Sequence, residues 1–132
     1  MFALDSNAVI HALKGKGGVA ERLLAVSPDQ IVIPAVALYE IQVGIAASPQ
    51  GSHRRRSFEA LLGAVTIAPF DRAAADAATD IRHDLMQRGQ LIGPMDILIA
   101  ATALSRHLIL VTHNTAEFSR VAGLRLTDWF SA

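Results

Sequence analysis

Short apolar runs alternate with longer segments of helical spacing along the chain, and this alternation limits the possible folds more than any other feature. Strands buried on both faces are apolar at consecutive positions, whereas surface helices repeat their apolar residues every three or four positions. The predicted strands are Met1–Leu4, Ile31–Ile33, Val65–Ala68, Leu108–Val111 and Leu124–Leu126. We therefore expect an α/β fold with a central, mostly parallel sheet of about five strands, covered by helices on both faces.

Three longer helices are predicted over residues 34–47, 71–87 and 94–105. The first and third begin with a proline, which is favoured at the start of a helix, and the second begins with an aspartate, which caps helices. The third is apolar on nearly every side, so it is expected to lie in the middle of the protein. A loop at Ser48–Ser52 separates the first of these helices from another that begins near His53.

Composition sets the broad class of the protein. The chain has 132 residues, of which 52% are hydrophobic, enough for the one domain that we expect over residues 1–132. The absence of cysteine excludes disulfides and zinc-thiolate sites. No signal peptide is recognisable, so the cytoplasm is the expected location. The longest apolar stretch, Ile31–Ala47, includes Glu40 and is too short for a membrane span, so we expect no membrane association.

Three acidic residues lie in segments that otherwise have the pattern of a core. Asp5 directly follows the first strand, and Glu40 and Asp96 lie in apolar helical segments with no lysine or arginine within four residues. An unpaired buried carboxylate costs several kcal/mol, so three of them require a cation or a shared purpose. Oxygen ligands without cysteine favour Mg²⁺ or Mn²⁺ over Zn²⁺.

Each acid also has a structural alternative. Asp5 could simply cap the helix that follows it. Asp96, two residues after Pro94, could complement the dipole at the start of its helix. Glu40 could face solvent, although its neighbours one helical turn away are too apolar and too small for ordinary surface.

Two further places carry polar candidates. Asn114 follows the fourth strand and could ligate a metal or hold a water, with Glu117 adding charge, although the same pair resembles a helix capping box. The run Arg54, Arg55 and Arg56 is the only dense positive charge in a chain of zero net charge. A run of this kind is usually a solvated face, but here it could bind RNA phosphates or an acidic partner segment.

Four ordered blocks of sequence resemble the PIN-domain ribonucleases, and among them the VapC-like toxins of type II toxin-antitoxin systems. They are Leu4–Asn7, Tyr39–Gly44, Arg88–Gly89 with Ile92–Ala100, and Leu110–Phe118, with Asp128–Trp129 near the end. The blocks cover nearly the whole length at the spacing of the family.

The resemblance implies a PIN-like fold in which Asp5, Glu40 and Asp96 form an acidic triad that binds Mg²⁺ or Mn²⁺. It also implies a toxin, usually dimeric, that is silenced by a VapB-like antitoxin. This sequence departs from the family at two positions. Ser6 replaces the usual threonine and keeps its hydroxyl, and Asn114 replaces an acid, which leaves open whether Glu117 supplies the missing charge.

The expected activity is metal-dependent hydrolysis of RNA phosphodiester bonds. Asp5 and Asp96 would hold the metal, Glu40 would bind metal or orient the attacking water, and Ser6 or Asn114 would position substrate or water. The alternatives are a catalytically inactive PIN-like module that binds RNA or protein, and a phosphoacceptor signalling domain. The latter requires adjacent acids after the first strand and a lysine after a late strand, and the sequence has neither.

Overall fold

The structure is a computed structural model that describes residues 1–130, and its centre is one five-stranded sheet. The strands are β1 (Phe2–Leu4), β2 (Ile31–Pro34), β3 (Thr66–Ala68), β4 (Ile109–Val111) and β5 (Leu126–Thr127). Their order is β3-β2-β1-β4-β5, and every neighbouring pair is parallel. The predicted α/β class and mostly parallel sheet are therefore confirmed.

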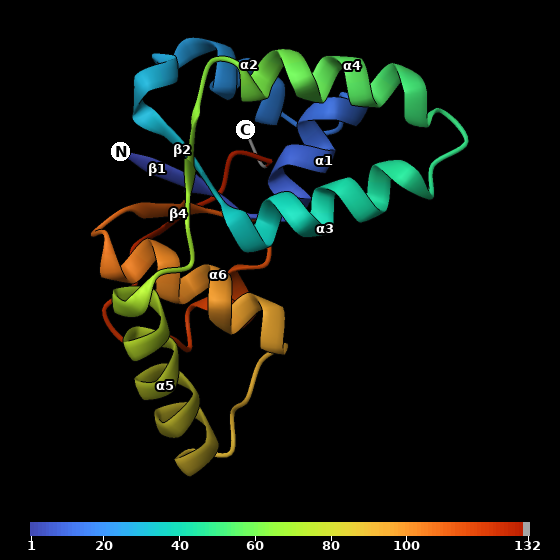
Figure 1. Cartoon of the computed structure of the whole chain (residues 1–132). Coiled ribbons are helices and arrows are strands. Elements are labelled where there is room, and N and C mark those ends of the chain that lie inside the picture. Colours follow the sequence, from blue (N-terminus) through green and yellow to red (C-terminus); the bar gives the residue numbers. More distant parts are fainter. Residues whose placement is uncertain (131–132) are drawn as a thin grey trace.

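Helices cover both faces of this sheet. They are α1 (Ser6–Lys14), α2 (Val19–Ala25), α3 (Ala35–Ala46), α4 (Gly51–Leu62), α5 (Arg72–Gln87), α6 (Pro94–Ser105) and α7 (Thr115–Phe118), with a short 3-10 turn at Pro28–Gln30. In Figure 1, α2 and α4 lie at the top, α1 lies to the right of the strands, and α5 and α6 lie below them. The three predicted long helices are present, and Asp71 caps α5 by accepting a hydrogen bond from the Ala74 N–H at 3.0 Å.

Two elements start two residues away from their predicted positions, and the other boundaries that differ are shifted by one residue. Helix α4 begins at Gly51 rather than at His53, because its first turn already closes with a bond from the Arg54 N–H to the Gln50 carbonyl. The last strand lies later than predicted, at Leu126–Thr127. Its position is set by its partner, since β4 pairs Leu110 with Leu126.

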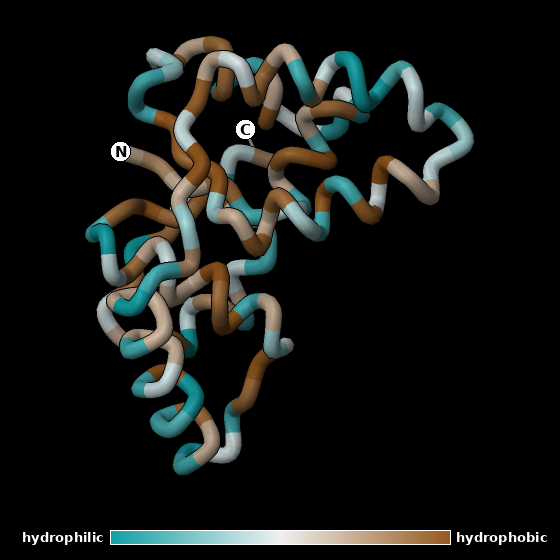
Figure 2. The backbone as a smooth tube through the Cα atoms, viewed as in Figure 1, coloured by the Kyte–Doolittle hydropathy of each residue, from teal (hydrophilic) through white to brown (hydrophobic). Residues whose placement is uncertain are grey.

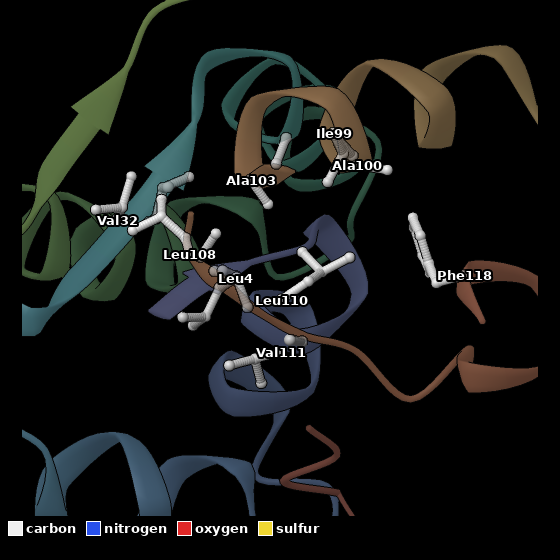
Figure 3. Close-up of a cluster of buried hydrophobic side chains, with 14 of the residues drawn as sticks. Leu4, Val32, Ile99, Ala100, Ala103, Leu108, Leu110, Val111 and Phe118 are labelled. Atoms are coloured by element: carbon white, nitrogen blue, oxygen red, sulfur yellow. The ribbon is translucent and has the colours of Figure 1, made fainter. Parts of the chain in front are cut away.

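The core is densest between the sheet and α6. Figure 3 shows Ile99, Ala100 and Ala103 of α6 beside Leu4 and Leu110 of the strands, and all five are fully buried. Alanines on this helix let its backbone approach the sheet closely. Hydrophobic residues gather along the strands in Figure 2. Within residues 1–130, no helix has both the length and the apolar character needed to cross a bilayer.

The strand order places the functional site. From β1 the chain builds outward through β2 and β3 on one side, then returns to add β4 and β5 on the other. Because β1 and β4 are neighbours, with Leu4 paired to Val111, the residues that follow them meet at the point where the winding reverses. Ligands of open α/β sheets bind beyond the carboxyl ends of the strands at this point.

Candidate functional site

Asp5 lies at the carboxyl end of β1 and is only 3% exposed. Its backbone N–H continues the sheet by donating to the Val111 carbonyl, and its Oδ1 accepts a hydrogen bond of 2.8 Å from the Ala8 N–H. Asp5 therefore does cap α1, as the structural alternative proposed. Capping explains the hydrogen bond of one carboxylate oxygen, but it does not explain why the whole carboxylate is almost completely buried.

Burial dominates the electrostatics of Asp5. It raises the pKa of Asp5 from 3.8 to about 6, although hydrogen bonds from Thr112 and from the Ala8 N–H act in the opposite direction, and the charges of Asp96 and Glu40 raise it further. A residue that served only as a helix cap would gain from being ionised. The ionised form of Asp5 is instead disfavoured, so a nearby cation would stabilise it.

Glu40 lies in the middle of α3 and is half-buried. Its Oε1 accepts a hydrogen bond of 3.0 Å from the Ser6 hydroxyl at the start of α1, 34 positions away in the sequence. Glu40 is thus directed toward α1 rather than into solvent, and the solvent-facing alternative is wrong. Ser6, for which the sequence suggested a positioning role, holds this carboxylate.

Asp96 lies in the first turn of α6 and is half-buried. Burial is the main cause of its raised pKa, followed by the charges of Glu40 and Glu117. Burial and the neighbouring carboxylates thus both disfavour the ionised form of Asp96. Gly93 leaves room beside this side chain, since a Cβ there would lie 3.4 Å from Asp96 Oδ2.

Asn114 and Glu117 contact each other at the start of α7. The Asn114 side-chain amide donates to Glu117 Oε2 at 3.2 Å, and no side-chain hydrogen bond caps the helix, so the capping-box alternative is wrong. Glu117 acts electrostatically on Asp96, which places it at the edge of the same group of acids. Asn114 retains its amide oxygen as a neutral acceptor there.

Thr112 is a residue that the sequence analysis missed. It directly follows β4, is 1% exposed, and its hydroxyl oxygen accepts a hydrogen bond of 3.0 Å from the Asn114 N–H. The same side chain hydrogen-bonds to Asp5. It thus joins the segment after β1 to the segment after β4. The sequence did offer one indication of this role, since Thr112 is a polar residue between a buried strand and the candidate site residue Asn114.

The charges of the acids at this edge of the sheet all have the same sign. Neither Asp5 nor Asp96 has an arginine or lysine among the groups that shift its pKa. The arginine run lies on α4, so it is not part of this group. Within residues 1–130, no group of three acidic or histidine side chains lies close enough together to hold a metal ion. Like charges repel one another, so small side-chain rotations would be needed to close the oxygens around a cation.

Comparison with known proteins shows the family of the chain. The family model of the PIN domain matches residues 2–124. The chain belongs to the PIN-domain family. It is 35% identical over 128 residues to the tRNA(fMet)-specific endonuclease VapC of Shigella flexneri, covering 97% of both chains. It is 29% identical over 131 residues to the ribonuclease VapC2 of Rickettsia felis, covering 98% of both.

Solved structures of VapBC complexes share the fold. DNA-bound VapBC from Salmonella typhimurium has a chain that is 31% identical, with a TM-score of 0.88 and 97% of each chain covered. VapBC2 from Rickettsia felis, bound to a promoter DNA fragment, has a TM-score of 0.88 at 28% identity, covering 97% of this chain and 98% of that one. Within the PIN-domain family, this chain is therefore grouped with the VapC ribonucleases.

The raised pKa of Asp5 makes stability depend on pH. Because the folded protein holds this proton more tightly than the unfolded chain, the metal-free protein should lose stability as pH rises from 3.8 through about 6. A pKa difference of about 2 between the folded and the unfolded protein corresponds to a change of about 3 kcal/mol in the free energy of unfolding. Urea denaturation across this range should show a smaller fall for Asp5→Asn, which cannot ionise. Parallel curves for the two proteins would contradict the assignment.

Replacing Thr112 tests whether it positions the acids. Thr112→Val keeps the shape and removes the hydroxyl, whereas Thr112→Ser keeps the hydroxyl. Residues that orient metal ligands typically contribute about 10–100-fold to metal affinity or activity. We expect the valine variant to bind Mn²⁺ more weakly by about this factor, and the serine variant to bind it normally. The measurement is the stabilisation against heat that Mn²⁺ gives each protein. Equal Mn²⁺ affinity in all three proteins would limit Thr112 to packing.

Proposed function

We propose that this protein is a metal-dependent endoribonuclease and the toxin of a toxin-antitoxin pair, with Asp5, Glu40 and Asp96 at its active site. The observation that carries the proposal is the meeting of these carboxylates, from three separate segments, at the winding-reversal point of the sheet. Neighbouring carboxylates help to raise the pKa of Asp5 and of Asp96, and no arginine or lysine within residues 1–130 lowers either of these pKa values. The likeness to VapC ribonucleases over almost the full length supports the same reaction.

The donor atoms favour Mg²⁺ or Mn²⁺. All of them are carboxylate or amide oxygens, and the chain has no cysteine. When bound, such a cation would offset charge on the phosphoryl oxygens and increase the acidity of a water molecule. Its positive charge would also remove the mutual repulsion of the acids.

The protein side chains divide the remaining tasks. Asp5 and Asp96 would hold the cation, and Glu40 would either join them or accept a proton from the attacking water. Ser6 orients Glu40 through its hydrogen bond of 3.0 Å. Asn114, whose amide donates to Glu117, presents its oxygen to substrate or water.

The partners follow from the relatives. Several structural neighbours are VapBC complexes, and we assign this chain a VapB-like antitoxin that inhibits it. RNA is the substrate, and the name of the Shigella flexneri relative makes transfer RNA the first RNA to test. An inactive binding module is the alternative, but it would have no use for three buried or half-buried acids that repel one another.

Asp96 separates catalysis from a structural role. The native protein should cleave RNA with Mg²⁺ or Mn²⁺ and stop in EDTA, and Asp96→Asn should abolish cleavage. Because the substitution removes repulsion, the metal-free variant should be as stable as the native protein or more stable. Metal at a hundredfold excess over its dissociation constant should stabilise the native protein by about 2.7 kcal/mol and the variant much less.

The exposed Asp80 of α5 provides the matched control, since Asp80→Asn removes the same charge from another helix. It should retain both cleavage and the metal response. If Asp96 acted only on the helix dipole, its substitution would lower stability by about 0.3–1 kcal/mol and spare activity. Thermal melts with and without metal, combined with a cleavage assay, distinguish these outcomes. Full cleavage in EDTA by the native protein would contradict the proposed function.

The homodimer expected from the resemblance has a candidate surface on α3. Tyr39 and Val43 lie one helical turn apart and are 56% and 53% exposed, which is unusual for large apolar side chains beside an active site. Val43→Glu should convert a dimer into a monomer in light scattering after gel filtration. Leu24→Glu, at an 87% exposed position on α2, is the control and should leave the mass unchanged. A dimeric Val43→Glu protein would place the interface elsewhere.

A further inference from the structure

A polar groove lies where α3 ends and α4 begins. It has a volume of about 530 Å³. In Figure 1 this junction is the loop at the far end of α3, away from the sheet. Its polar side chains come from Ser48, Gln50, Ser52, His53, Arg55 and Arg56. It is separate from the acids at the carboxyl ends of β1 and β4.

The groove is locally basic in a protein without net charge. Residues 41–58 contain three arginines and one histidine but no aspartate or glutamate. Arg55 and Arg56 are exposed, and neither takes part in an ion pair within residues 1–130. Glu59 lies one helical turn further along α4, but no ion pair within residues 1–130 joins it to either arginine, so both guanidinium groups can act on a bound anion.

Arg54 differs from its two neighbours. It is half-buried, and its guanidinium donates to the Ser48 hydroxyl at 2.5 Å and to Gln50 Oε1 at 3.5 Å. These bonds tie the loop before α4 to the first turn of the helix. Arg54 therefore stabilises the loop that forms the groove, whereas Arg55 and Arg56 line the groove and are exposed to solvent.

The groove is connected to the acidic site through α3. This helix carries Glu40, and Ile45 and Ala46, one to two turns further on, line the groove. At a rise of 1.5 Å per residue, Glu40 and Ala46 are about 9 Å apart along the helix axis. Because Ile45 and Ala46 lie on the side of α3 opposite Glu40, an RNA strand with its scissile phosphate at the acids would reach the arginines around the end of this helix.

We propose that this groove binds backbone phosphates of the RNA substrate next to the position of cleavage, through Arg55 and Arg56. The inference rests on the proposed function, since it concerns the substrate of that site. The polar lining favours phosphates over apolar side chains of a peptide. The groove would supply the local positive charge that an otherwise neutral ribonuclease needs to hold RNA near repelling carboxylates.

The test is RNA binding without cleavage. Fluorescence anisotropy of a labelled, mixed-sequence single-stranded RNA oligonucleotide is measured in EDTA at several salt concentrations. Each lost phosphate contact lowers the salt slope of log affinity by about 0.7 for single strands, so Arg55→Ala with Arg56→Ala should lower it by about 1.4. Replacement of both by lysine should retain the slope. Arg54→Ala should retain the slope and lower the melting temperature.

A second double variant controls for total charge. Arg72→Ala with Arg82→Ala removes two exposed arginines from α5 and should leave the slope unchanged. An unchanged slope in the Arg55 and Arg56 alanine variant overturns the inference, as does an equal fall in the α5 control. An unchanged RNA slope together with lost binding to a polyglutamate peptide would assign the groove to a protein partner and also overturn it. Because binding is measured without metal, a protein that binds through the groove but never cleaves would contradict the proposed function alone.

Discussion

The burial of one carboxylate, that of Asp5, determines how the rest of the site is built. Asp5 continues the sheet through its backbone and starts α1 through its side chain, so it cannot leave the core without disturbing both elements. Its burial disfavours the ionised form even though two hydrogen bonds support that form. The fold therefore places an unsatisfied negative charge at the point where two strands end, and the neighbouring acids increase that charge.

This arrangement depends on the close packing beneath it. Strands of only two to four residues hold their register because both faces of the sheet are covered. Helix α6 contributes alanines that let it lie close to the sheet, beside Leu4 of β1 and Leu110 of β4. The same helix carries Asp96 in its first turn. A helix that supplies both the core and an acid fixes that acid relative to the sheet. Asp5 and Asp96 are thus positioned by packing rather than by bonds to each other.

Features with a strong local cause could be predicted from the sequence. Pro34, Asp71 and Pro94 mark helix starts through their own backbone and capping chemistry, and the structure agrees. Asp5, Glu40 and Asp96 could be selected because a carboxylate in an apolar segment is costly wherever the segment folds. Whether these acids lie close together depends on the order of the strands. The sequence predicted a mostly parallel sheet but not that order.

Features that depend on tertiary partners could not be predicted. Thr112 has the composition of an ordinary strand end, and its importance appears only when β4 lies beside β1. Arg54 and Arg55 are equivalent in the sequence, yet the turn before α4 brings Ser48 to the first and leaves the second exposed. Asn114 and Glu117 have the spacing of a capping box, but their side chains bond to each other instead.

The hydrogen-bond donors of Asp5 and Glu40 show how these carboxylates are oriented without losing their negative charge. Glu40 receives its hydrogen bond from Ser6, and Asp5 receives its side-chain bond from Thr112; both donors are neutral hydroxyls. An arginine in either place would also orient the carboxylate, but its positive charge would stabilise the ionised acids and compete with a metal. Neutral donors fix the direction of the oxygens and leave the negative charge uncompensated. A protein that must hold both a cation and a polyanionic strand gains from keeping its arginines on a separate helix, where they act on the strand without neutralising the acids.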